Sequence, residues 1–196
     1  MARRADHTRE ELTGLALQAG LELIKEEGFS HFSARKVAAR IGYTLGTLYH
    51  VFGSYDDFIL HINACTLDEW FAFMQEALKK NKRKEPLHVL ARAYIDYARN
   101  HYQQWIALFE HHPGKDREVP DWYREKMTRF FALVEEPLLK RIGDSRKAKR
   151  FARVLWTSIH GICVLSLSGK LERVETDSAE VLAASLIDNY IVGLKQ

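Results

Sequence analysis

The chain has 196 residues, of which 46% are hydrophobic and 28% are charged, and its formal net charge is +3. This length allows a substantial buried core, as one domain or one and a half, and the mild positive charge permits nucleic-acid binding without requiring it. The two cysteines lack metal-ligand spacing, no apolar run reaches the length of a membrane span, and the N-terminus lacks the apolar core of a signal peptide. We therefore expect a cytoplasmic protein without a membrane segment.

Almost the whole chain is predicted to be helical, because proline is scarce and no segment shows the sustained alternation of a strand. The predicted fold class is all-α, with about nine helices. The first helix is expected to run from about residue 8 to residue 27, where Gly28 ends it as a left-handed cap. Residues 32–52 then predict two short helices joined by a tight turn, with Ser33 and Thr44 as candidate N-caps.

A long helix is expected next, over residues 55–80. A basic segment at residues 79–84 follows it, and we interpret this segment as a solvated loop between helices. Pro86 and Pro120 suit the first turns of two further helices, because proline is tolerated at that position. The further helices are expected at about residues 86–102, 105–111, 120–141, 146–168 and 177–194.

Residues 32–52 also carry the spacing of a helix-turn-helix. The small Ala38 lets the second helix approach the first, Gly42 can adopt the left-handed conformation that reverses the chain, and Leu48 fills the shared core. Such a unit places a short helix in the major groove of DNA, so the chain is predicted to bind DNA. A plain helical hairpin is the alternative that these three residues also fit.

The run from Gly42 to Phe52, GYTLGTLYHVF, resembles the recognition helix of TetR-type repressors. Residues 19–24 and 28–29 resemble the first helix of that family, and residues 54–58 resemble the start of its fourth helix. A weaker similarity, to the Trp-His-Gly signature of one TetR C-terminal subgroup, lies at Trp156, His160 and Gly161. The resemblance implies a ligand-responsive repressor that binds a palindromic operator as a dimer and is released by a small hydrophobic inducer.

Two positions depart from the pattern of this family. Tyr55 stands where the family usually has a lysine that pairs with a phosphate, and Tyr43 stands where it usually has a small aliphatic residue. Arg3, Arg4 and Arg9 are interpreted either as a basic arm that reaches DNA or as a disordered tail.

DNA binding combines phosphate contacts, which position the protein, with base contacts, which give specificity. The start of the second predicted helix offers backbone N–H groups and cationic side chains as a phosphate site. Leu45 and Gly46 are the residues most able to reach base edges, because glycine lets the helix lie deep and leucine can touch a thymine methyl group. The candidate phosphate-site residues are Ser33, Arg35 and Lys36, and the resemblance implies backbone contacts at Thr44, Thr47, Tyr49 and His50.

The predicted domains are a helix-turn-helix DNA-binding domain over residues 1–54 and a helical ligand-binding and dimerisation domain over residues 55–196. The second of these is rich in aromatic residues, whose helical spacing predicts a core and whose concentration also suits an apolar cavity. The resemblance implies that a small hydrophobic ligand binds there. The candidate ligand-binding residues are Trp105, Phe109, Trp122, Phe130, Trp156 and His160, of which His160 can instead be a hydrogen-bonded structural residue.

The last two predicted helices carry apolar stripes and small residues, a pattern typical of the four-helix bundle that two copies of a chain form. The candidate dimer-interface residues are Phe151, Leu155, Ile159, Val181, Leu182, Ser185, Leu186 and Asn189. The alternative is that these stripes only cover the core of one chain. A homodimer fits operator binding, because two heads spaced by about 34–36 Å read a palindrome in double-stranded DNA.

We find no nucleophile elbow, phosphate-binding loop or zinc-ligand spacing, and the adjacent pairs His111-His112 and Glu135-Glu136 face different ways on a helix, so the chain is not expected to be an enzyme. No cofactor and no metal site are expected. Two alternatives stay open beside the ligand-responsive repressor. One is a metal-responsive regulator with ligands from separate helices, and the other is a helical protein-interaction module.

Overall fold

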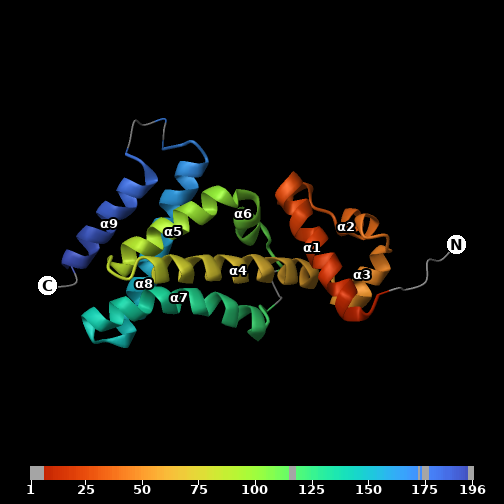
Figure 1. The fold of residues 1–196 in the computed structure, drawn as a ribbon, viewed down its shortest axis with the longest axis horizontal. Coiled ribbons are helices and arrows are strands. Elements are labelled where there is room, and N and C mark those ends of the chain that lie inside the picture. The colour runs from red at the N-terminus through yellow and green to blue at the C-terminus, as the bar shows by residue number, and fades with distance from the viewer. Residues whose placement is uncertain (1–6, 115–117, 172, 174–176, 194–196) are drawn as a thin grey trace. The chain divides into compact units, whose positions relative to one another are not determined.

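The computed structural model describes residues 7–114, 118–171, 173 and 177–193, so the predicted arm residues Arg3 and Arg4 lie outside the described residues. Nine α-helices and no strand occur in the described part of the chain, which confirms the all-α prediction (Figure 1). The elements are α1 (Arg9–Glu27), the 3-10 turn η1 (Phe29–His31), α2 (Ala34–Arg40), α3 (Leu45–Phe52), α4 (Tyr55–Lys80), α5 (Pro86–Asn100), α6 (Tyr102–Glu110), α7 (Asp121–Ile142), α8 (Ser145–Leu167) and α9 (Ala179–Gly193).

The helices form two compact units. The first unit comprises Met1–Asp68 and His101–Tyr123, and the second comprises Glu69–Asn100 and Arg124–Gln196. The first unit therefore contains α6 and the beginning of α4 in addition to the helix-turn-helix. The helix α4 is continuous, and its residues 55–68 belong to the first unit while residues 69–80 belong to the second.

The helix boundaries of the first unit follow from its capping residues. The Thr8 hydroxyl accepts from the N–H of Glu11 at 3.2 Å, and the Glu11 carboxylate accepts from the N–H of Thr8 at 2.7 Å, so a capping box starts α1. Gly28 ends α1 with φ +78° and ψ 165°, a conformation open mainly to glycine but extended rather than left-handed helical. Ser33 precedes α2 without a side-chain capping bond, whereas the Thr44 hydroxyl caps α3 by accepting from the N–H of Thr47.

The helix-turn-helix is built as its spacing predicts. Gly42 has φ +77°, and the next N–H, of Tyr43, donates to the Ala38 carbonyl at 2.9 Å and closes the turn after α2. Leu48 is fully buried in a core that α1, α2, α3, the beginning of α4 and Ala107 of α6 share. This core fixes the orientation of α3 within the first unit.

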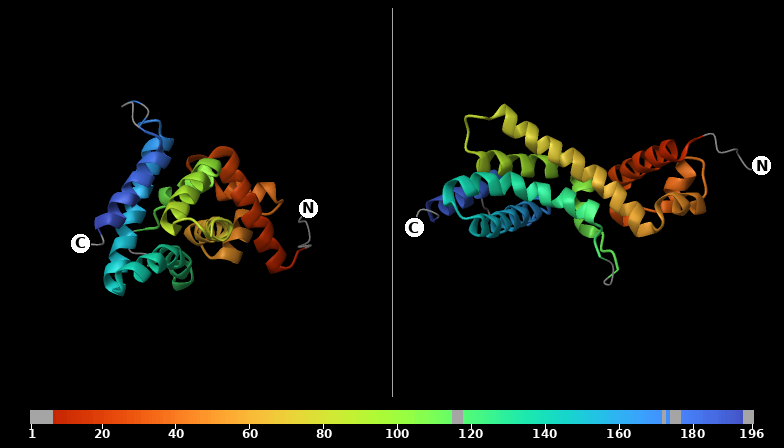
Figure 2. Two further views of the ribbon diagram at one scale, coloured as in Figure 1. Left: turned by 60° about the vertical axis from the view of Figure 1, so that its left-hand side comes forward. Right: turned by 90° about the horizontal axis from the view of Figure 1, so that it is seen from below.

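The second unit is organised around α5. Buried side chains occur on almost every face of this helix, because it packs against α8 and α9, which also pack against each other. Figures 1 and 2 show α8 and α9 lying side by side. One face of each of these two helices is therefore used within the chain.

Candidate nucleic-acid interface and ligand cavity

The outer face of α3 is the centre of the candidate DNA interface. Leu48 and Phe52 are buried and hold the helix from behind. All candidate contact residues of this segment are exposed or partly exposed, namely Thr44, Leu45, Gly46, Thr47, Tyr49 and His50. Leu45 and Tyr49 also pack against the core of the first unit, so the more accessible front of this segment is formed by Thr44, Gly46, Thr47 and His50.

The N-terminal end of α3 is prepared for close approach by a ligand. The first N–H groups of an α-helix have no acceptor inside the helix and favour anions. A Cβ atom added at Gly46 would meet the Thr44 hydroxyl oxygen at 3.7 Å, which is ordinary contact, and no other neighbour is as close. Packing within the chain therefore does not require glycine at position 46, whereas close approach of a DNA backbone would.

Two contacts from the N-terminal side hold α3 in place. His7 Nδ1 and the Tyr43 hydroxyl share a hydrogen bond of 2.8 Å. The Arg9 guanidinium donates to the Val51 carbonyl at 3.1 Å. Sequence reasoning missed the role of Tyr43, which had stood out only as a departure from the family pattern. Nothing local in the sequence connects it to His7, because the two residues meet through tertiary packing.

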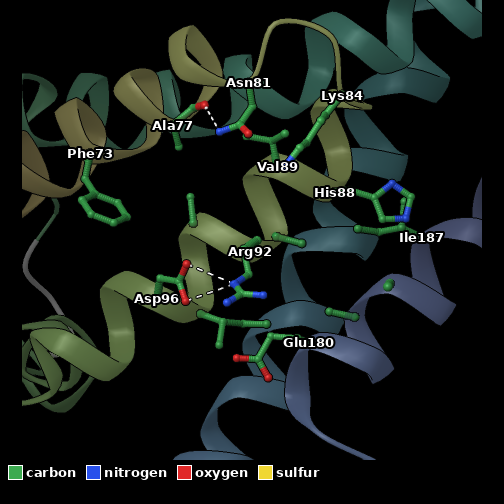
Figure 3. A pocket seen from close by; sticks show the side chains of 15 residues that line it. Phe73, Ala77, Asn81, Lys84, His88, Val89, Arg92, Asp96, Glu180 and Ile187 are labelled. Atoms are coloured by element: carbon green, nitrogen blue, oxygen red, sulfur yellow. Dashed lines mark hydrogen bonds and ion pairs between the residues drawn. The ribbon is translucent and has the colours of Figure 1, made fainter.

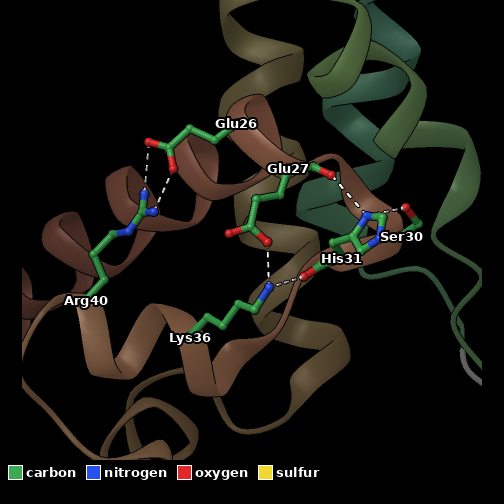
Figure 4. A network of polar contacts seen from close by, with 6 residues as sticks. All are labelled: Glu26, Glu27, Ser30, His31, Lys36 and Arg40. Carbon is green, nitrogen blue, oxygen red and sulfur yellow. Dashed lines mark hydrogen bonds and ion pairs between the residues drawn. The ribbon is translucent and has the colours of Figure 1, made fainter.

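The cations of α2 are paired with acidic residues of α1 (Figure 4). Lys36 Nζ lies 2.5 Å from a Glu27 carboxylate oxygen and also donates to the His31 carbonyl at 3.3 Å. Arg40 forms a bidentate ion pair with Glu26, in which Nη1 and Nη2 donate to Oε1 and Oε2 at 3.2 and 2.6 Å. This hydrogen bonding lowers the pKa of the Glu26 carboxyl and raises that of Arg40.

These pairs change the balance among the candidate phosphate-site residues. Ser33 is partly exposed, while Arg35 and Lys36 are exposed. Arg35 makes no ion pair with any residue that the structure describes, so its charge is available to a phosphate. Lys36 would have to exchange Glu27 for a phosphate, which was not evident from the sequence because Glu27 belongs to another helix.

A partly buried polar contact joins the segment after α6 to the first turn of α4 inside the first unit. His111 Nε2 lies 3.1 Å from Asp56 Oδ1, and only 6% of the His111 side chain is exposed. The His111 ring also packs edge-on against Phe29, with 6.0 Å between ring centroids. Nothing local in the sequence predicts the contact between His111 and Asp56, because these two residues lie 55 positions apart.

An apolar cavity of about 50 Å³ lies in the second unit. The residues that line it include Tyr94, Phe130, Val134, Leu155, Trp156 and Ile159. Two of the candidate ligand-binding residues, Phe130 and Trp156, are therefore in its wall. The other aromatic candidates, Trp105, Phe109 and Trp122, belong to the first unit, where Trp105 is completely buried.

His160 stands behind the wall of this cavity. Its Nδ1 shares a hydrogen bond of 2.8 Å with the Tyr94 hydroxyl, and its ring stacks on Trp156 with 5.4 Å between centroids. Burial lowers the pKa of His160. These contacts are those of a structural histidine that orients two residues of the cavity wall.

The candidate dimer residues fall into two groups. Leu155 and Ile159 are 4% and 5% exposed and line the apolar cavity, so they belong to the core of the chain itself. The remaining candidates are exposed or partly exposed, namely Phe151, Val181, Leu182, Ser185, Leu186 and Asn189.

The outer face of α8 carries a second apolar stripe that sequence reasoning did not select. Val154, Ser158, Gly161 and Leu165 follow one another at spacings that place them on one side of a helix. Val154 and Leu165 are both 43% exposed, and a Cβ atom added at Gly161 would meet no atom within 4 Å. Described residues of the chain cover this stripe only in part.

The described part of the chain contains neither a candidate metal site nor a candidate membrane span. No three His, Cys, Asp or Glu side chains gather there as metal ligands, and none of its helices is long and apolar enough to cross a membrane. Both cysteines are free thiols, and burial raises the pKa of Cys163 to about 12, which leaves this thiol unreactive.

Several known proteins resemble this chain in sequence or in fold. An uncharacterized HTH-type transcriptional regulator of Mycobacterium tuberculosis, Rv0681, is 24% identical over 179 residues, which cover 91% of this chain and 78% of that protein. A structure of a Rhodococcus sp. RHA1 protein of unknown function has a TM-score of 0.74 at 17% identity, with all of both chains covered. The multidrug binding protein EbrR, solved with imidazole, has a TM-score of 0.58 at 19% identity over 96% of each chain. The Rhodococcus protein and EbrR therefore have the same fold as this chain.

Two family models match the sequence itself. The family described as bacterial regulatory proteins, tetR family, matches residues 16–62, which include the whole helix-turn-helix. The family described as tetracyclin repressor-like, C-terminal domain, matches residues 87–190, more than half of the chain. The chain therefore belongs to the TetR family of DNA-binding transcriptional regulators.

Proposed function

We propose that the chain is a repressor that binds a palindromic operator as a homodimer and releases it when a small hydrophobic inducer binds. The observation that carries the proposal is the front of α3, where six candidate contact residues are accessible while Leu48 and Phe52 anchor the back. Arg35 adds an exposed cation at the start of α2 for phosphate. Leu45 and Gly46 supply the approach to base edges.

The outer faces of α8 and α9 support the homodimer. These faces include apolar and small residues, with Val181 half exposed and a Cβ atom added at Gly161 meeting no atom within 4 Å. Two copies of this helix pair would complete a four-helix bundle and bury both faces. A two-fold dimer then presents two recognition helices to half-sites about 34–36 Å apart.

The apolar cavity supports the inducer. Its walls are aliphatic and aromatic, but a volume of about 50 Å³ does not accommodate a drug-sized molecule, which needs about 300 Å³ or more. An inducer would therefore bind a conformation in which the cavity is enlarged, and binding would shift the protein towards that conformation. The solved complex of EbrR with imidazole belongs to a protein that shares this fold.

The test is operator selection from a pool of random duplexes with the full chain, followed by fluorescence anisotropy. We expect a palindrome bound by a pair of chains about 10³-fold more tightly than a scrambled duplex of equal length. Replacing Arg35 by glutamine should weaken binding to both duplexes and lower the salt slope by about 0.9, the loss of one phosphate contact. Replacing Leu45 by alanine should weaken binding to the palindrome alone.

Equal affinity for the palindrome and the scrambled duplex would contradict sequence-specific regulation. The inducer is tested on the same selected duplex by adding neutral aromatic molecules such as indole and naphthol. If each molecule that binds the protein leaves its DNA affinity unchanged, release by an inducer is wrong, while operator recognition stands on its own measurement.

A further inference from the structure

A groove of about 330 Å³ lies in the second unit between the last turns of α4, the outer side of α5, and α9 (Figure 3). This volume reaches the lower end of the range for small-molecule sites, about 300–1,000 Å³. The lining residues of the groove and of the apolar cavity overlap only at Ala91 and Ile187. The groove is therefore a separate site with separate chemistry.

The walls of the groove are largely apolar. Phe73 and Ala77 from α4 face Val89 from α5, and Ile187 from α9 lies at one side. Phe73 is 37% exposed although its ring packs against Tyr97, so an occupant would remove aromatic surface from water. Such a surface favours a ligand with a hydrocarbon chain or ring.

The charges at the groove are not balanced once the ion pairs are counted. Asp96 is paired with Arg92 at 3.2 Å, and Glu180 is paired with Arg99 at 2.8 Å. His88 is held by Asp188 at 3.1 Å. Each carboxylate that lines the groove is therefore already matched by a guanidinium.

Lys84 is the lining cation that forms no ion pair within the described part of the chain. Its side chain descends from the turn after α4 towards α5, at the end of the groove near Asn81 (Figure 3). Lys79, Lys82 and Arg83 of the same basic segment also lack an ion pair with described residues, which makes the potential at this end positive. The unmatched charge of the groove is thus positive and lies at one end.

We propose that this groove binds a small amphipathic monoanion, a carboxylate carrying an apolar chain or ring. The carboxylate pairs with Lys84, and the apolar part lies between Phe73, Val89 and Ile187. A neutral molecule of the same shape would form no ion pair with Lys84. A polyanion would make no favourable contact with the apolar walls. The site does not depend on the inducer of the apolar cavity, and its occupant carries a charge that the cavity cannot neutralise.

The experiment is titration calorimetry of the full chain with octanoate and with octanol, both below the concentrations at which they aggregate. We expect octanoate to bind with one molecule per chain and octanol to bind about tenfold more weakly, the value of one charge-assisted hydrogen bond. In K84Q the preference for octanoate should disappear. K82Q is the matched control, because it removes the same charge from the same turn at a residue that does not line the groove, and it should keep the preference.

A second pair of variants separates the groove from the cavity. A184W fills the groove from α9 and should abolish octanoate binding, whereas V134W fills the apolar cavity and should leave it intact. Circular dichroism and thermal unfolding establish whether each variant is folded. If A184W does not fold, the comparison of K84Q with K82Q still tests the proposal. The proposal is overturned if octanoate binds no better than octanol, if K84Q keeps the preference, or if V134W rather than A184W removes binding.

Discussion

At the scale of single residues, two glycines with similar surroundings have different expected functions. Gly46 lies on the exposed front of α3 and Gly14 lies on α1, and neither meets a close neighbour at the position of an added Cβ. Both have the negative φ of an ordinary helical residue, so the backbone does not require glycine at either position. A difference between them must therefore come from something outside the chain.

We expect G46A to leave the free protein as stable as before or more stable by up to about 1 kcal/mol, because alanine favours a helix. The same substitution should weaken DNA binding, because the methyl group stands where the backbone of DNA approaches. G14A is the control, with the same gain in stability and unchanged DNA affinity. Urea unfolding and anisotropy measure the two quantities, and equal DNA affinity of G46A and the unaltered chain would remove Gly46 from the interface.

At the scale of secondary-structure elements, α1 and α2 are held together by two ion pairs, one of which uses a cation expected at DNA, Lys36. Exposed ion pairs contribute little to stability, because water screens them and two long side chains must be ordered. Their effect on DNA binding is larger, since a lysine held by a carboxylate is not available to a phosphate. The Lys36–Glu27 pair therefore sets how much of the positive charge of α2 reaches DNA.

We expect E27Q to strengthen DNA binding and to steepen the salt slope by about 0.9, because it frees Lys36 for a phosphate. K36Q should then cost more affinity in the E27Q background than in the unaltered chain, and the double-mutant cycle isolates this coupling. E22Q, on the same helix without a contact to Lys36, controls for the general loss of negative charge. If K36Q costs the same in both backgrounds, Lys36 acts only as a brace.

The success of sequence reasoning at this scale depended on how local the signals are. Ala38, Gly42 and Leu48 lie within one short segment, so their spacing predicted the helix-turn-helix and the structure confirms it. Thr44 likewise caps the helix that it precedes. The pairing of Lys36 with Glu27 could not be foreseen, because it depends on how α1 and α2 cross.

Periodicity also failed to separate competing apolar faces. On α8 it selected Leu155 and Ile159, which the structure places in the core of the chain, and it passed over the outer stripe around Gly161. A helix with apolar residues on two sides gives the same signal for both. In the same way, helical spacing identified Trp105 as a core residue but could not tell in which unit that core lies.

At the scale of the whole molecule, the proposed operator reading depends on the proposed assembly of two chains through the outer faces of α8 and α9. A single head makes too few contacts for a specific complex, and linking two heads multiplies their affinities. The outer stripe of α8 suits this purpose, because Gly161 and Ser158 leave room for another helix between Val154 and Leu165.

We expect G161R to convert the proposed dimer into a folded monomer, because a Cβ atom at this position meets no atom within 4 Å while the long side chain would block a partner helix. Operator affinity should fall by about 100-fold or more through the loss of two-headed binding. K149E, an exposed substitution away from the outer stripe of α8, is the control and should stay dimeric. Sedimentation velocity gives the mass of each variant, and a G161R protein that remains dimeric would place the interface elsewhere.

The hydrogen-bonded pair of Tyr94 and His160 has a consequence for which molecules the apolar cavity admits. The lowered pKa of His160 keeps its imidazole neutral at physiological pH, so neither member of this pair carries a formal charge. An ion that entered would lose its hydration without gaining a counter-ion, whereas an uncharged hydrocarbon would lose nothing. The cost of desolvation therefore excludes charged ligands from the cavity, whatever their shape.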